Sequence, residues 1–141
     1  MNISLEIFME DNSFVNKSIT VTNEKLNILK KNIYNEFNIP IEKQEWYLNG
    51  DILCDNFNNW IKGDYVLFIN NDIVEIKFLI NNNITNMYIN KNITVKELKN
   101  ILSINDNIYI RNELLEDNNT INEYNYYIPL TINNKLSTCS I

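Results

Sequence analysis

Apolar and polar residues alternate along two short segments at the start of the chain. Residues 3–10 alternate in this way, and residues 17–22 do so again after a polar turn at residues 11–13. A period of two residues is typical of half-buried strands, because successive side chains of a strand point to opposite faces. The two segments therefore predict a β-hairpin.

The next segment changes to the spacing of a helix. Its apolar positions lie three or four residues apart, at Leu26, Leu29, Ile33 and Phe37. This spacing places all of them on one face of a helix. Asn23 is the expected N-cap, and Pro40 is expected to end the helix, because the residue before a proline avoids helical backbone geometry.

Two more predicted strands, residues 45–48 and 65–69, complete the first half of the chain. The same order of elements starts again after Asn70-Asn71-Asp72. In the second half a capping box at residues 94–97 predicts the start of a helix. The strands expected there are residues 74–80, 85–93, 108–110 and 128–132.

An internal repeat of this length predicts two domains. We expect them at residues 1–70 and 73–132, followed by a C-terminal tail at residues 133–141. Pro129 falls within the last predicted strand. Because proline has no N–H to donate to a neighbouring strand, this strand is expected to start late or to bulge there.

The composition narrows the classes of partner and compartment. The chain has 141 residues, a net charge of −6 and no cluster of Lys or Arg, so nucleic acids and anionic membranes are poor partners. No segment is long and apolar enough to cross a membrane. Cys54 and Cys139 are too few for a disulfide framework, which indicates a reducing compartment. We expect a cytoplasmic, monomeric protein.

The inventory of reactive residues argues against an enzyme. The chain contains no histidine, so it has neither a Ser-His nor a Cys-His nucleophile pair and no histidine metal ligand. Two distant cysteines make no zinc site, and two glycines in the whole chain leave no glycine-rich phosphate loop. The sequence therefore predicts a protein without catalytic residues, metal or cofactor.

Two stretches resemble ubiquitin at matching places in their repeats. Residues 39–53, Ile-Pro-Ile-Glu-Lys-Gln-Glu-Trp-Tyr-Leu-Asn-Gly-Asp-Ile-Leu, are similar to its helix exit, third strand and following turn. Residues 115–125, Leu-Glu-Asp-Asn-Asn-Thr-Ile-Asn-Glu-Tyr-Asn, are similar to the turn and short helix before its last strand, where Tyr124 would tie the loop to the backbone. The resemblance implies an α+β fold of two tandem β-grasp (ubiquitin-like) domains. Such a chain is similar to the interferon-induced two-domain ubiquitin-like modifier and to its bacterial counterparts in antiphage defence.

The resemblance also implies where partners would bind. Ubiquitin's main recognition surface is centred on an outward-facing residue of the third strand, and the matching positions here are tyrosines. The expected partner-binding residues on the third and last strands are Tyr47, Leu67, Tyr109 and Thr131. An exposed tyrosine on a rigid strand offers a large contact area at small entropy cost, although the same residues can also simply cover a solvated face. Trp46 and Ile108 are expected in the core.

The tail departs from the pattern of ubiquitin, which ends in Gly-Gly. Leu136-Ser137 occupies that place, and no glycine follows. A variant remains open in which a protease trims the tail to a small residue. The residues expected to be processed or activated are Leu136, Ser137, Thr138, Cys139, Ser140 and Ile141. Cys139 is then a processed terminus, a redox-sensitive thiol or an ordinary surface cysteine.

Two function classes follow. In the first, the chain is a covalent modifier whose tail is processed or activated by a partner enzyme, so that its partners include an activating enzyme and a tail protease. The alternative is a non-covalent ubiquitin mimic or interaction module, which binds ubiquitin-binding proteins and is never conjugated. A tail of about nine residues after the last strand favours the modifier, whereas the missing glycine favours the mimic.

Overall fold

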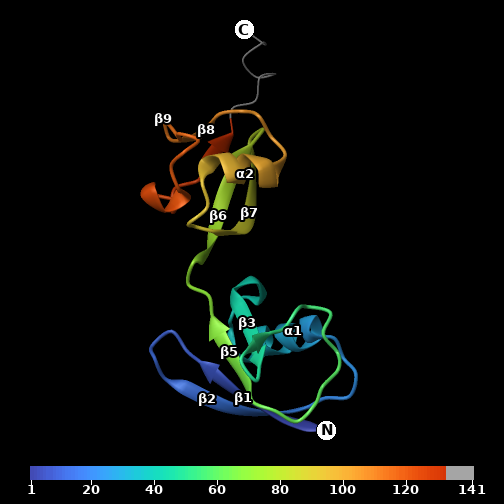
Figure 1. Cartoon of the computed structure of the whole chain (residues 1–141). Helices are drawn as coiled ribbons and strands as arrows, with labels where there is room; N and C mark the ends of the chain where they lie inside the picture. The colour runs from blue at the N-terminus through green and yellow to red at the C-terminus, as the bar shows by residue number, and fades with distance from the viewer. Residues whose placement is uncertain (133–141) are drawn as a thin grey trace. The chain divides into compact units, whose positions relative to one another are not determined.

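The computed structural model of the chain describes residues 1–132 and is shown in Figure 1. The chain divides into two compact units, with the boundary between Asn71 and Asp72. Within the described residues, each unit contains a five-stranded mixed sheet and one α-helix.

The first unit has its two terminal strands side by side in the middle of the sheet. Its elements are β1 (Asn2–Phe8), β2 (Phe14–Thr20), α1 (Leu26–Phe37), the 3-10 helix η1 (Ile41–Lys43), β3 (Gln44–Leu48), β4 (Asp51–Ile52) and β5 (Tyr65–Ile69). The strand order is β2-β1-β5-β3-β4, and β1 and β5 are parallel. Helix α1 lies against one face of this sheet (Figure 1).

The second unit repeats this topology. Its elements are β6 (Ile73–Ile80), β7 (Asn83–Asn90), α2 (Val95–Leu102), β8 (Ile108–Ile110), β9 (Glu113–Leu114), the 3-10 helix η2 (Ile121–Glu123) and β10 (Leu130–Ile132). The strand order is β7-β6-β10-β8-β9, with β6 and β10 parallel. Two strands, a helix and further strands around a parallel central pair make the β-grasp arrangement, so the predicted α+β fold class is confirmed.

Most of the apolar positions predicted for the core are buried, whereas Phe37 at the end of α1 is only partly buried. Trp46 and Ile108 are fully buried, and so are the apolar helix residues Leu26, Leu29 and Ile33. They pack with the inward side chains of the strands into one core per unit. Burying one such side chain contributes roughly 1.5–3 kcal/mol, so each core carries most of the stability of its unit.

The first helix starts in a way that the sequence did not predict. Asn23 is not its N-cap: α1 begins at Leu26 after Lys25, which makes no side-chain capping bond. The backbone N–H groups of Leu26 and Asn27 donate instead to the carbonyls of Phe57 (2.8 Å) and Asp55 (3.0 Å). A distant loop therefore satisfies the donors that a capping side chain would otherwise satisfy.

The second helix starts with the capping box that the sequence predicted. Thr94 Oγ1 accepts a bond from the backbone N–H of Glu97 (3.1 Å), and the Glu97 carboxylate accepts one from the backbone N–H of Thr94 (3.1 Å). The last strand, β10, begins at Leu130, directly after Pro129, as the missing proline donor requires. Tyr124 also ties down its loop, because its hydroxyl accepts from the backbone N–H of Glu116 (2.9 Å).

Asparagine makes the tight turn between β6 and β7 without a glycine. Asn81 (φ 52°) and Asn82 (φ 66°) form the two-residue turn between β6 and β7, in which Ile80 pairs with Asn83. Consequently β7 begins earlier than predicted and ends at Asn90. Positive φ at both central residues matches the right-handed twist of the strands, and asparagine tolerates this conformation better than other side chains.

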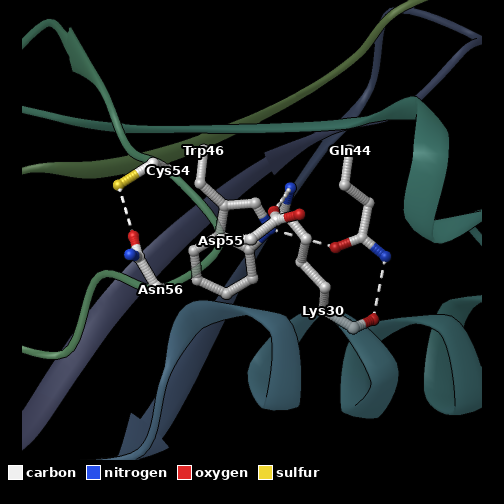
Figure 2. Close-up of polar contacts among 6 residues, drawn as sticks. All are labelled: Lys30, Gln44, Trp46, Cys54, Asp55 and Asn56. Carbon is white, nitrogen blue, oxygen red and sulfur yellow. Dashed lines mark hydrogen bonds and ion pairs between the residues drawn. The ribbon is translucent and has the colours of Figure 1, made fainter.

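A buried glutamine links α1 to β3 in the first unit, as Figure 2 shows. Gln44 Nε2 donates to the backbone carbonyls of Lys30 (2.9 Å) and Ile39 (3.0 Å), and Gln44 Oε1 accepts from Trp46 Nε1 (3.0 Å). Gln44 is only 3% exposed, so water does not replace these bonds. One side chain therefore satisfies three buried polar groups.

We expect Gln44→Met to keep the side-chain length and to lower the free energy of unfolding of the first unit by about 3 kcal/mol, because two carbonyls and an indole N–H lose their partner. Urea denaturation followed by tryptophan fluorescence measures this, since Trp46 and Trp60 both lie in the first unit. The exposed Glu42→Met is the matched control. Equal stability of the two variants would contradict the role of Gln44.

We expect Thr94→Ala to destabilise the second unit by about 1 kcal/mol, because it removes the cap of α2. Asn23→Ala should change the stability of the first unit by less than about 0.3 kcal/mol, since backbone carbonyls hold the start of α1. Amide hydrogen exchange of the core strands measures both effects in the full chain. A larger loss of stability in Asn23→Ala would show that Asn23 does cap α1.

Candidate functional site

Tyr47 lies on the outward face of the first sheet, opposite the face that packs on α1. It is half-buried, whereas its neighbours along β3 are buried in the core. Across the sheet it is directly opposite Val66 of β5 and Ile52 of β4. Ile52 is 62% exposed, so the outward face around Tyr47 is apolar and accessible.

Leu67 does not share this face, and its predicted place on the binding surface is wrong. Leu67 is fully buried and pairs with the equally buried Trp46. Residues that are directly opposite in a sheet point to the same face, so both face α1. The outward residues of β5 are therefore Val66 and Phe68, one position on either side of Leu67.

Four aromatic rings form a continuous cluster on this outward face. The ring of Phe8 stacks on that of Phe68, with 5.0 Å between centroids, and also contacts Phe14 at 5.9 Å. Tyr47 meets Phe68 edge to face at 5.6 Å. Phe14 is 58% exposed and Phe68 is 43% exposed, so the cluster offers large apolar surfaces to solvent. We call these four residues the aromatic face.

The sequence did not lead us to predict a surface role for Phe8, Phe14 and Phe68, although the pattern of apolar residues pointed to one. Residues 65–69 are apolar at every position, so a strand there must present apolar side chains to both faces. Phe8 likewise occupies a position where the alternation of β1 calls for a polar residue. Apolar residues in the polar phase of several half-buried strands together indicate a contiguous apolar surface.

The outward face of the second sheet carries an aliphatic row instead of an aromatic cluster. Thr131 is directly opposite Tyr109 and also pairs with Leu79, so both predicted residues face outward together. The row continues to Ile84, which is 66% exposed, and to Leu114, which is 41% exposed. The partner-binding role of Tyr109 and Thr131 stays a prediction.

The remaining polar contacts in Figure 2 lie within the first unit. Lys30 Nζ forms an ion pair with Asp55 Oδ1 at 2.7 Å, and the exposed thiol of Cys54 donates to Asn56 Oδ1 at 2.9 Å. Among residues 1–132, no group of three or more His, Cys, Asp or Glu is arranged to hold a metal ion. No described helix has the length and apolar character that crossing a membrane requires.

A hollow of about 450 Å³ lies between the β1–β2 turn and the end of α1. Its lining combines apolar side chains, including Phe37 and Ile69, with Glu10 and Asp11. Hydrogen bonds from the side chain and then the backbone of Ser13 hold the pKa of the Asp11 carboxyl below its usual range. This mixture of apolar and acidic groups identifies no particular small molecule.

The tail residues expected to be processed, 136–141, lie outside the described residues.

No known family model matches the chain, and no curated protein matches it. Among solved structures, the chain is similar to the ubl5 domain from the polyubiquitin locus of T. thermophila, determined in solution by NMR. The two are 15% identical, the match spans 48% of this chain and 89% of that domain, and the TM-score is 0.36. The fold assignment rests on the strand order and register described above, which make each unit a ubiquitin-like module.

Proposed function

We propose that this chain is a protein-binding ubiquitin-like module that engages its partner through the aromatic face of the first unit. The observation that carries this proposal is the four-ring cluster of Phe8, Phe14, Phe68 and Tyr47 on the outward side of the sheet. Exposed apolar patches are costly in water and mark interaction surfaces in many proteins.

The physical properties of the aromatic face suit it to protein recognition. Aromatic side chains bury large areas and have few rotatable bonds, so they bind with a small loss of entropy. Their strands are paired on both sides, apart from the edge strand β2 that carries Phe14. The rings are therefore held in place before a partner arrives, which lowers the cost of association.

The function takes one of two forms, which differ in how the partner is joined. As a covalent modifier, the chain would be processed or activated through residues 136–141 and attached to a target. As a non-covalent mimic, it would bind ubiquitin-binding proteins without conjugation. The aromatic face serves both forms, and the resemblance to two-domain ubiquitin-like modifiers supports the first.

We expect a photo-crosslinking amino acid at position 14 of the full chain, expressed in its native cells, to yield discrete heavier species. Adding Phe68→Ala should lower their yield roughly thirtyfold, as truncation of a central anchor costs about 2 kcal/mol. The same crosslinker at Tyr127, which is 83% exposed on the second unit, is the matched control. Equal adducts from positions 14 and 127 would remove the aromatic face as the docking surface.

Mass spectrometry of the chain from native cells distinguishes the two forms. For the modifier we expect species shortened within residues 136–141, or joined to other proteins through the C-terminus, and deletion of these residues should abolish the joined species. Unaltered residues 136–141 in every species would eliminate the covalent form. Crosslinking from position 14 should survive the deletion in either case.

A further inference from the structure

The outward face of the first sheet carries charge of one sign. The outward positions of the described strands β1 to β5 are Asn2, Ser4, Glu6, Phe8, Phe14, Asn16, Ser18, Thr20, Glu45, Tyr47, Ile52, Val66 and Phe68. Among them only Glu6 and Glu45 bear a formal charge, and both are carboxylates. The aromatic face therefore lies in a negative environment without a cation at any of these strand positions.

Both carboxylates are next to the rings. Glu45 is directly opposite Phe68 and precedes Tyr47 by two residues, which places all three on the same face. Glu6 is directly opposite Val66 and two residues before Phe8. Glu45 and Phe68 are directly opposite in an antiparallel pair, so their Cβ atoms are about 5 Å apart and a group that lies on the rings reaches the Glu45 carboxylate as well.

The nearby lysines of the first unit do not offset this charge. Lys17 pairs with Glu36 of α1 at 2.9 Å, and Lys43 pairs with Glu10 at 3.8 Å. Lys30 is held by Asp55 on the helix side of the sheet. Residues 1–71 as a whole contain ten Asp and Glu against six Lys and no Arg, so the long-range field also attracts cations.

We infer that the partner is a protein segment with arginine or lysine beside an apolar side chain. This inference rests on the proposed function and specifies the chemistry of its partner. A guanidinium group stacks on the face of an aromatic ring and forms paired hydrogen bonds with a carboxylate, and this surface offers both. An apolar neighbour in the same segment covers the rest of the rings. A partner with an acidic rim is rejected, because its carboxylates would face Glu6 and Glu45.

The second unit provides an internal contrast. Its outward face carries Glu75 and Lys77 on the same strand, two residues apart, so it has no single sign of charge. The preference for a basic partner is therefore a property of the first unit alone.

The experiment selects a random peptide library displayed on phage against the immobilised full chain. Each enriched peptide is then synthesised, and its affinity is measured for the wild type, for Phe68→Ala and for the double variant Glu6→Gln/Glu45→Gln. The glutamines keep the shape of the face and remove only its charge. Glu75→Gln is the matched control on the second unit, and circular dichroism verifies that every variant is folded.

We expect peptides that depend on Phe68 to contain Arg or Lys beside Leu, Phe or Trp. Their affinity should fall about tenfold in the double variant, remain unchanged in Glu75→Gln and weaken as salt screens the charges. Phe68-dependent peptides that lack a basic residue, or that bind the double variant equally well, would overturn the inference and leave the docking surface intact. A selection without any Phe68-dependent peptide would overturn both the docking surface and the inference.

Discussion

The pairing of the first and last strand of each unit is the constraint on which the rest of the fold depends. The parallel pairs β1–β5 and β6–β10 join segments about 60 and 50 residues apart in sequence and occupy the middle of their sheets. Their register determines the face of every side chain on the neighbouring strands, because a slip of one residue exchanges the two faces. In the first unit, the register of this one pair therefore determines both the core on the helix side of the sheet and the aromatic face on the opposite side.

Local patterns in the sequence predicted the helices and the longer strands but not the short strands β4 and β9, and the surfaces required the pairing of strands. The capping box of α2 lies within four consecutive residues, so it can be predicted from the sequence. The start of α1 could not be predicted, because carbonyls about 30 residues away accept hydrogen bonds from its first backbone N–H groups. Leu67 was assigned to the wrong face for the same kind of reason. In a strand that is apolar throughout, only the buried partner Trp46 decides which residues point inward.

The two units share a fold and differ in what they present to a partner. The first sheet shows aromatic rings beside carboxylates, whereas the second shows an aliphatic row around Tyr109 with charges of both signs. The outward residues differ between the two sheets, and a substitution at such a position leaves the core packing unchanged. Two units with the same fold can therefore carry two different surfaces.

The asparagine turns have a consequence for the unfolded chain. Glycine leaves the backbone more conformations than any other residue, and these are lost when the protein folds. With asparagine at Asn81 and Asn82, the turn between β6 and β7 keeps its left-handed geometry while the unfolded chain has fewer states to lose. A chain with two glycines in 141 residues therefore loses less backbone conformational entropy on folding than a glycine-rich chain of the same length would.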